Sequence, residues 1–582
     1  MKKHKHLTLF CFLYFLLIGC QRSVSEKEKL FQVIESFENH TSISDESPLG
    51  DYSQERFDQD DLFYQELQDK LASIDKKHLE ETDQISFEIL SFLINEERVQ
   101  YQFNRHWNPI LSDAGFHISL TFRVRELRNR KAVIDYLKFL EAIPTYIEQQ
   151  KELILKGIQA GISQPLVIFK GYESSYRQHI TPTAEDNYYF SPLKKLPPVL
   201  PQSFKDSVID VGKSIITEKV IPTFQSIDEF FQAQYLPHTR TTIGTSDTPD
   251  GLAYYQSRIH YYTTLDLTAQ EIHDKGLEEV ARIRNEMQSI IEELNFEGDF
   301  NEFLNFLRTD PQFYAKTPQE LLMFARDVSK RLDEQLPRYF ITLPRKPYGV
   351  VKVPDAIAPK YTGGRYVGTD ANSTEPGYYL VNTYNLTSRP LFVIPSLTAH
   401  EAVPGHHLQV ALSKEMSDQV PKFRRQLYLS AYGEGWALYC EYLANEMGTY
   451  RTPYEQFGKL TYEMWRACRL AVDTGIHAFG WTRDQAVDYM KKNTALSTHE
   501  INTEVDRYIS WPGQALSYKI GEMKIRELRE KAEDELGSDF DIRAFHEVIL
   551  EQGVVTLPIL EQRILDFIER VKKDSQSSSL NV

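Results

Sequence analysis

Four side chains that could bind a metal or move a proton lie within eight positions: His400, Glu401, His406 and His407, in S-L-T-A-H-E-A-V-P-G-H-H-L-Q-V (396–410). Zinc hydrolases use a histidine followed directly by glutamate, with a further histidine downstream. The imidazoles hold the ion, and the glutamate takes a proton from water. The segment therefore predicts a zinc site with His400 as a ligand and Glu401 as the general base.

The spacing differs from the usual H-E-x-x-H helix, in which the two histidines are four residues apart. On a regular helix His406 and His407 would lie about 9 and 10.5 Å along the axis from His400. Two bonds of about 2.0–2.1 Å to one ion cannot span such a separation. Because Pro404 removes a backbone hydrogen bond and Gly405 accepts unusual dihedral angles, we expect the helix to bulge. A bulge of two residues makes His406 the ligand, whereas a bulge of three selects His407.

The third ligand is expected in A-Y-G-E-G-W-A-L-Y-C-E-Y-L (431–443), which has a helical pattern. Glu434 is our candidate, since glycines on both sides would let its helix pass close to the first. Glu441, two turns along the same face, is expected to orient a ligand histidine. The alternative interpretation is a pair of surface histidines, a core helix and two solvated glutamates.

These segments, together with R-Y-I-S-W-P-G-Q-A-L-S-Y-K-I-G (507–521), resemble domain-of-unknown-function family 885, a group of bacterial proteins regarded as zinc peptidases. The stretches G-Y-Y-L-V-N-T (377–383) and R-L-A-V-D-T-G-I-H (469–477) extend the resemblance, which is clear from about 244 to 525. It implies a mostly helical, gluzincin-like architecture related to helical carboxypeptidases and oligopeptidases, with His406 as a ligand. It implies no particular substrate.

A candidate substrate contact precedes the metal segment. Asn382 lies on the predicted strand 378–383, and related zinc peptidases use an edge strand there to hold the substrate backbone by strand addition. Asn382 would then face the substrate. The alternative is an amide that satisfies a turn.

Arg469, Asp473 and His477 recur every four residues and are expected on one helix face. Asp473 could orient His477 or bind Arg469, and an oriented His477 could hydrogen-bond the oxyanion. A surface ladder of ion pairs is the alternative interpretation.

In the last motif, Tyr518 follows a Pro512-Gly513 turn on a predicted helix. Related helical peptidases use a tyrosine from a late helix to stabilise the tetrahedral intermediate, and we assign that role to Tyr518. Tyr508 is the reserve and a second possible substrate contact. The planar guanidinium of Arg507 could bind a substrate carboxylate, and a buried ion pair is the alternative.

The predicted fold is mainly α, with two helical halves around an active-site cleft and a small β-sheet beside the zinc helices. The best strand candidates are 349–353 and 378–383. A capping box at 268–271 (T-A-Q-E) opens a long helix through Met287. The expected division of the chain is a signal peptide (1–19), a lipidated tether (20–30), an N-terminal helical domain (31–243), a zinc-binding catalytic domain (244–573) and a disordered tail (574–582).

The N-terminal sequence predicts localisation to the cell envelope. Lysines precede the apolar run 7–19, which is too short to cross a bilayer and suits a signal-peptide core. The L-I-G-C that follows resembles the bacterial lipobox, which implies that Cys20 is lipidated and anchors the protein to the membrane. Gln21 after the cysteine is compatible with the outer membrane of a Gram-negative cell.

Composition fits a large folded enzyme. The 582 residues are 41% hydrophobic and 12% aromatic, which excludes wholesale disorder. The formal charge, 66 minus 83 or −17, argues against nucleic acid as a partner. Cys440 and Cys468 are expected either to pair or to be buried free thiols.

The expected activity is zinc-dependent hydrolysis of a peptide or related amide bond, with one zinc ion and a peptide as substrate. A non-enzymatic lipoprotein that binds peptides or another protein is one alternative, although it would not need Glu401 as a base. A zinc amidohydrolase of non-peptide substrates is another. The sequence leaves the oligomeric state open.

Overall fold

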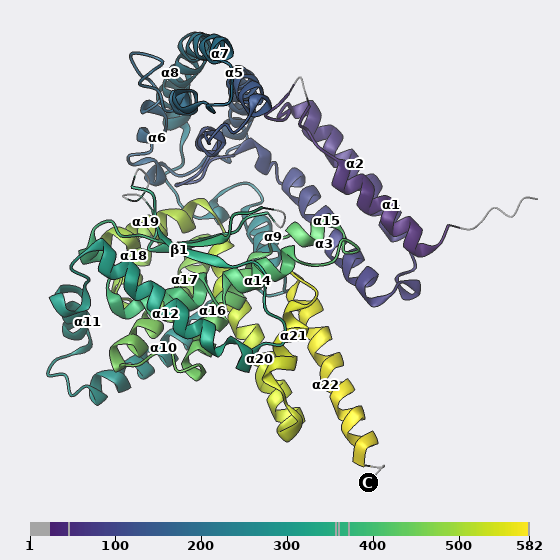
Figure 1. Ribbon diagram of the computed structural model, residues 1–582, viewed down its shortest axis with the longest axis vertical. Coiled ribbons are helices and arrows are strands. Elements are labelled where there is room, and N and C mark those ends of the chain that lie inside the picture. The colour runs from purple at the N-terminus through teal and green to yellow at the C-terminus, as the bar shows by residue number, and fades with distance from the viewer. Residues whose placement is uncertain (1–23, 45–46, 356–357, 359–360, 371–372, 580–582) are drawn as a thin grey trace, which may run out of the picture.

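The computed structural model describes residues 24–44, 47–355, 358, 361–370 and 373–579 (Figure 1). The described chain is mainly helical, with one small sheet of three strands. The predicted signal peptide and Cys20 lie outside the described residues. Within the described part, no helix is both long and apolar enough to cross a bilayer.

The N-terminal helices are α1 (Glu26–Asn39), α2 (Gln54–Ala72), α3 (Glu81–Gln102), α4 (Phe116–Ser119), α5 (Arg130–Gln159), α6 (Ser174–Arg177), α7 (Gln202–Ile215) and α8 (Ile221–Phe230). Figure 1 shows α5 to α8 gathered at one end of the molecule, with α1 and α2 beside them. Single turns of π-helix follow α7 and α8.

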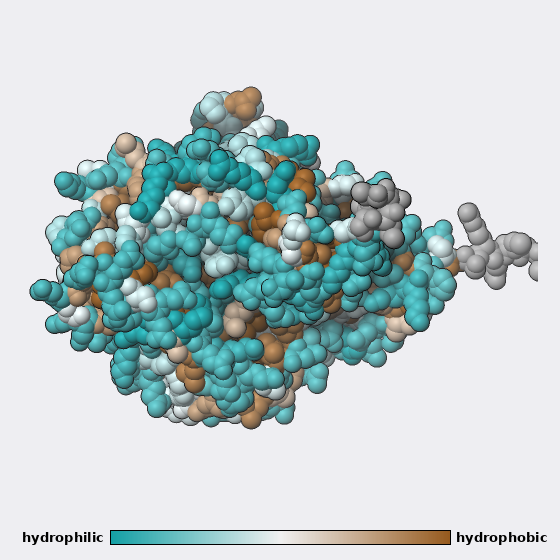
Figure 2. All heavy atoms as spheres, turned by 90° about the horizontal axis from the view of Figure 1, so that it is seen from below, coloured by the Kyte–Doolittle hydropathy of each residue, from teal (hydrophilic) through white to brown (hydrophobic). Residues whose placement is uncertain are grey.

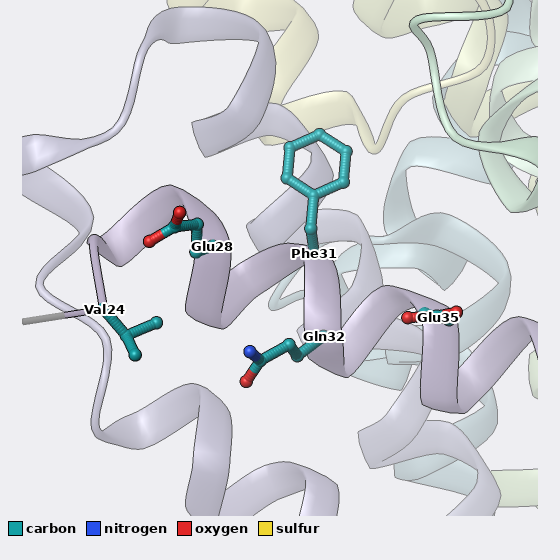
Figure 3. Close-up of a pocket in the computed structure, with 5 residues that line it drawn as sticks. All are labelled: Val24, Glu28, Phe31, Gln32 and Glu35. Atoms are coloured by element: carbon teal, nitrogen blue, oxygen red, sulfur yellow. The ribbon is translucent and has the colours of Figure 1, made fainter. Parts of the chain in front are cut away.

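Helix α1 corrects the predicted length of the tether. Ser25 accepts a hydrogen bond from the backbone N–H of Glu28, whose carboxylate accepts one from the N–H of Ser25, so this capping box starts the helix at Glu26. Residues 26–30, expected in the tether, are therefore helical. The exposed side of α1 carries a pocket lined by Val24, Glu28, Phe31, Gln32 and Glu35 (Figure 3).

The remaining helices are α9 (Gly251–Thr263), α10 (Ala269–Glu293), α11 (Phe300–Thr309), α12 (Pro318–Tyr339), α13 (Ile394–Glu401), α14 (His406–Lys414), α15 (Lys422–Gln426), α16 (Ser430–Glu446), α17 (Pro453–Ala478), α18 (Arg483–Asn493), α19 (Thr498–Ser510), α20 (Ser517–Leu536), α21 (Ile542–Leu550) and α22 (Leu557–Ser579). The predicted capping box is confirmed at Thr268 and Glu271, and its helix continues past Met287 to Glu293.

Helices α16 and α20 pack backbone against backbone. A Cβ on Gly435 would lie 2.6 Å from the Cα of Gly521, and one on Gly521 would lie 2.0 Å from the carbonyl oxygen of Ala431. Only glycine fits at both positions. The close approach that Gly435 allows is therefore to α20, whereas it was predicted to be to the helix of His400.

The sheet has the order β1-β3-β2, with β1 (Tyr348–Lys352) parallel and β2 (Gly364–Val367) antiparallel to β3 (Gly377–Val381). Both predicted strands are confirmed, with ends shifted by one or two residues, and β2 is an addition. Since β3 lies in the centre, the segment predicted as a substrate-binding edge has both edges paired. Tyr379 and Val381 of β3 pack in one core cluster with Leu397 of α13, so the sheet covers the helix that carries His400.

The hydrophobic core crosses the boundary predicted at residue 243. One core cluster contains Phe231 and Ile283, and a second contains Ile89 of α3 and Trp436 of α16. Arg258 of α9 also forms a buried ion pair with Glu96 of α3. The N-terminal helices thus share their core with the part of the chain that follows residue 243. Figure 2 shows that hydrophilic side chains predominate on one face, with apolar residues in small groups.

The C-terminus corrects a second prediction. Helix α22 continues through Ser579, whereas residues 574–579 were expected in a disordered tail. The buried residues Leu560, Ile564 and Phe567 anchor its earlier turns, and a helix that is already nucleated extends at little cost. Cys440 and Cys468 are both free and buried, which confirms the thiol alternative.

Candidate metal centre

His400 of α13, His406 of α14 and Glu434 of α16 come together at one point. The Nε2 atoms of the two histidines lie 3.4 and 3.5 Å from Oε2 of Glu434. The two imidazole rings are perpendicular, with centroids 4.8 Å apart. Among the described residues, this is the one group of three or more histidine, cysteine or acidic side chains close enough to hold an ion.

A two-residue bulge between α13 and α14 makes this convergence possible. The N–H of Gly405 donates to the carbonyl of Ala399, six residues back, and that of His407 donates to Ala402, five residues back, instead of four. A Cβ at Gly405 would lie 2.0 Å from the carbonyl oxygen of His400, so no larger residue fits there. The backbone therefore has the deformation that the Pro404-Gly405 pair predicts.

Glu441 orients the first histidine, as predicted. Its Oε1 lies 2.7 Å from Nδ1 of His400, and the hydroxyl of Ser396 donates to its Oε2 at 2.5 Å. The carboxylate is only 1% exposed. A Nδ1–H that donates to Glu441 would leave Nε2, which faces Glu434, as the ring nitrogen for a metal, and this is the tautomer that a metal ligand needs.

The charges of the centre depend on one another. Burial alone would lower the pKa of His400, but Glu434 and Glu441 outweigh it and raise that pKa to about 9. Burial would raise the pKa of Glu434, yet His406 and His400 hold it well below its usual value. A proton on the His400 imidazole therefore supplies positive charge where a divalent cation would otherwise supply it. Two imidazole nitrogens and one carboxylate are a ligand set that zinc uses in catalytic sites.

Glu401 ends α13 beside the centre and is 9% exposed. Its Oε2 accepts a hydrogen bond of 2.7 Å from the backbone N–H of Tyr366 in β2. Among the described residues, this is the one hydrogen bond that the carboxylate accepts, and its Oε1 accepts none. Strand β2 thus fixes the carboxylate and leaves one oxygen available for a proton.

His407, the alternative ligand, points away from the centre. Its Nδ1 lies 3.1 Å from the hydroxyl of Tyr366, and its ring packs against Tyr348 at 4.7 Å between centroids. Burial lowers the pKa of His407 to about 4, so it is neutral at pH 7. Its position follows from the bulge of two residues rather than three.

Tyr428 belongs to the site and was missed in the sequence. It lies in the coil before α16, and its hydroxyl donates to Oε1 of Glu434 at 2.7 Å. A Cβ on Gly433 would lie 2.6 Å from the Tyr428 ring, so that glycine makes room for it. Tyr428 is 46% exposed and is therefore accessible from solvent. A tyrosine in a coil has no periodicity that could have identified it.

The predicted oxyanion role of His477 is wrong for this structure. Its Nδ1 lies 3.1 Å from the N–H and 2.9 Å from the hydroxyl of Thr245, and its Nε2 lies 2.9 Å from the carbonyl of Tyr508. Both nitrogens are therefore used. The residue is fully buried, and burial lowers its pKa to about 4.

Asp473 likewise has a different role from the one expected. Its carboxylate accepts from the hydroxyl of Tyr255 at 2.6 Å and from the N–H of Gly513 at 3.1 Å, rather than binding His477 or Arg469. Burial raises the pKa of Asp473 to about 7. It holds the turn before α20 in place.

Asn382 is fully buried and does not face a substrate. Its amide nitrogen lies within 3.0 Å of the carbonyls of Ala358, Tyr361 and Thr362, and its side-chain oxygen accepts from the N–H of Tyr384. Asn382 therefore ties the loop between β1 and β2 to the end of β3. This is the turn-satisfying role that was the alternative.

The last motif divides into buried and accessible residues. Tyr508 is 1% exposed, and its hydroxyl accepts from Trp465 and Arg469, so it does not face a substrate as predicted. Arg507 donates to Gln514 at 2.7 Å and to Glu504 at 3.3 Å, which is the ion-pair alternative, yet its side chain keeps 14% exposure.

Tyr518 is half-buried at the start of α20. The guanidinium carbon of Arg469 lies 4.3 Å from the centroid of its ring. The neighbouring Ser517 hydrogen-bonds Ser430, at the start of α16, at 2.7 Å. Tyr518 is therefore close to the helix of Glu434, and its assignment to the oxyanion stays a prediction.

Comparison with solved structures supports the fold and extends over nearly the whole chain. A candidate lipoprotein from Colwellia psychrerythraea is 26% identical with a TM-score of 0.85, over 94% of this chain and 100% of that one. A candidate lipoprotein of unknown function from Shewanella oneidensis is 19% identical with a TM-score of 0.68, over 92% and 97%. No curated protein matches the chain. The family described as "Bacterial protein of unknown function (DUF885)" matches residues 38–564, and the chain belongs to this family.

Proposed function

We propose that this protein is a zinc-dependent hydrolase of peptide or related amide bonds, with a gluzincin-like centre. The observation that carries the proposal is the convergence of His400, His406 and Glu434 beside Glu401, one of whose carboxylate oxygens has no hydrogen-bond partner among the described residues. A site that only bound zinc would not need a carboxylate placed as a base.

The three converging side chains would hold the ion. Zinc, when bound there, lowers the pKa of water to about 7 and polarises a carbonyl. Glu401 would accept the proton through Oε1 and pass it to the leaving amine, while Tyr366 holds Oε2 in place. Glu441 keeps the His400 ring in the required tautomer throughout.

Strand β2 is our candidate for holding the substrate backbone. It is an edge strand, and the N–H of Tyr366 that reaches Glu401 points away from β3. A peptide added along this edge would pass beside Glu401. We therefore assign to β2 the binding of the substrate backbone that was predicted for the strand 378–383.

Two tyrosines could donate to the oxyanion. Tyr518 has the place expected for a late helix, and Tyr428 already contacts Glu434 and is exposed. His477 is removed from this role because its nitrogens are occupied.

Envelope anchoring is part of the proposal. L-I-G-C ends at Cys20, outside the described residues, and both similar structures are candidate lipoproteins. Lipid attachment at Cys20 would leave residues 21–25 as a short connection to α1. Cys20→Ser should abolish lipid labelling. A lipid label that persists in this variant would refute the anchor.

Turnover of a mixed peptide library tests the activity. The full chain should release new peptide masses, lose this activity in a chelator and regain it with added zinc. Glu401→Gln, which keeps the three ligands, is the matched inactive control. Absence of turnover by the zinc-loaded wild-type protein would contradict the proposal.

A further inference from the structure

A cluster of arginines lies behind the metal centre, on α17 and α19. Arg466 and Arg469 are one turn apart on α17, and Arg507 reaches the same place from α19. Nη2 of Arg466 lies 3.8 Å from Oε1 of Glu441, the carboxylate that orients His400. The cluster therefore begins one side chain away from a proposed ligand.

One carboxylate serves two of these arginines. Glu504 lies 3.1 Å from Nη2 of Arg469 and 3.3 Å from Nη2 of Arg507. Glu500 has no ion pair within 4 Å in the described chain, and burial and its neighbour Glu504 raise its pKa. Within ion-pair distance, the two guanidiniums therefore share the single carboxylate of Glu504.

The hydrogen-bonding groups of Arg469 are also incompletely used. This side chain is 4% exposed, its Nε donates to Tyr508 at 2.9 Å, and its Nη2 donates to Glu504. Its Nη1 is buried and has no partner among the described residues. A buried N–H donor without a partner is unfavourable, and more so on a charged group, so an acceptor that reached Nη1 would be bound favourably.

The surroundings give a ligand access. Arg507 is 14% exposed on its side chain, and within the described part of the chain two of its five N–H groups have partners, Gln514 and Glu504. Trp465 and Tyr518 are half-buried and stack against Arg469 at 4.5 and 4.3 Å. The planar fork of a guanidinium matches the two oxygens of a carboxylate.

We propose that Arg507, backed by Arg469, forms a subsite for a substrate carboxylate beside the metal centre. Arg507 contacts the carboxylate. Arg469 is a positioning residue that holds Glu504 in place, and its Nη1 is a further N–H donor beside the subsite. The inference rests on the proposed hydrolase activity and specifies its substrate as a peptide that carries a carboxylate close to the cleaved bond. Either the C-terminal α-carboxylate or an acidic side chain would supply it.

Three mixtures of N-acetylated tetrapeptides test the subsite with the full chain. One has free C-terminal carboxyls, one has C-terminal amides, and one has C-terminal amides with aspartate or glutamate last. Charge-assisted hydrogen bonds of about 1.5–3 kcal/mol predict that kcat/KM for a carboxylate-bearing mixture exceeds that for the plain amides about 10- to 150-fold. Preference for the first mixture identifies the α-carboxylate, and preference for the third identifies the side chain. Equal rates on all three overturn the inference.

Arg507→Gln should remove most of this preference, mainly through KM, whereas Arg507→Lys should restore part of it. Arg483→Gln is the matched control, because Arg483 also pairs with an acidic residue of α19, Asp506, at 2.6 Å but has no contact with Trp465 or Tyr518. A preference that survives in Arg507→Gln, or disappears equally in Arg483→Gln, overturns the assignment.

Binding separates a failure of the subsite from a failure of the activity. Equilibrium dialysis of the same mixtures with Glu401→Gln needs no turnover. Tighter retention of a carboxylate-bearing mixture supports the subsite even if the wild-type protein hydrolyses none of them, in which case the proposed activity fails alone. Equal retention of all three mixtures refutes the subsite even if the wild-type protein is active.

Discussion

Two buried groups of histidine and acidic residues in this chain look equally functional in the sequence and differ in the fold. In the metal centre, Nε2 of His400 and of His406 face a shared carboxylate, Glu434. In the group on α17, the nitrogens of His477 and the oxygens of Asp473 are taken by backbone and hydroxyl groups. Burial and regular spacing therefore do not identify a reactive site. What distinguishes the candidate metal centre is that the ligand atoms of its side chains face one another.

The pKa values of the two histidines express the same difference. Burial lowers both, but two neighbouring glutamates raise the pKa of His400 to about 9, whereas His477 has no carboxylate partner and falls to about 4. The first group retains positive charge on His400, which the proposed zinc ion would replace. The second is neutral and structural.

The largest expected effect separates the neighbouring histidines. His406→Ala should abolish stoichiometric zinc binding because it removes a proposed ligand, while His407→Ala, which changes a ring packed on Tyr348, should retain it. Zinc per chain, measured by mass spectrometry after gel filtration, gives the result. Zinc lost in His407→Ala and retained in His406→Ala would show that His407, and not His406, is the ligand.

Next in size is the contrast between two carboxylates. Glu401→Gln should keep zinc and lower kcat by about 10²–10⁴-fold, since a positioned base contributes about that factor. Asp473→Asn, which keeps its hydrogen bonds in the buried group, should leave kcat within a few-fold. An equal loss of kcat in Glu401→Gln and Asp473→Asn would contradict the different roles assigned to the two groups.

A smaller effect is expected from the residue that orients His400. Glu441→Gln should weaken the affinity for zinc about 10- to 100-fold, because a residue that hydrogen-bonds a metal ligand typically contributes that much to metal affinity. Competition with a chromophoric chelator measures the dissociation constant. An unchanged constant would mean that the tautomer of His400 is set by another contact.

The last expected effect concerns the pH dependence of stability rather than zinc binding or turnover. His477 has a folded pKa of about 4 against 6.5 in the unfolded chain, so between these values the unfolded state binds more protons and stability rises with pH. Integrated over that window, the contribution is about 3 kcal/mol. Denaturant unfolding from pH 4 to 6.5 should show a shallower rise in His477→Gln than in the wild-type protein. Parallel curves would contradict the buried, neutral state of His477.

The bulged backbone between His400 and His406 is predictable from the sequence because its determinants are local. Pro404 and Gly405 lie within the motif itself, and the helix of Glu434 has a periodic pattern. Tyr428 and the N–H of Tyr366 are not predictable, since one lies in a coil and the other is a backbone group of β2. Residues far apart in the chain decide the remaining outcomes.

The wrong assignments have the same origin. Thr245 reaches His477 from 232 positions away, and Tyr255 reaches Asp473 from 218 positions away. Spacing on α17 placed both residues on one face correctly but carried no information on which partners would fill that face. The overall helical architecture is easier to predict from the sequence, because amphipathic periodicity and capping boxes are local features of the chain.

The most direct test of the account is anomalous diffraction at the zinc absorption edge from crystals of the full-length protein grown with zinc. We predict one strong peak within about 2.0–2.2 Å of Nε2 of His400, Nε2 of His406 and a carboxylate oxygen of Glu434. No peak at this position, or zinc bound to His407 instead, would contradict the proposed metal centre.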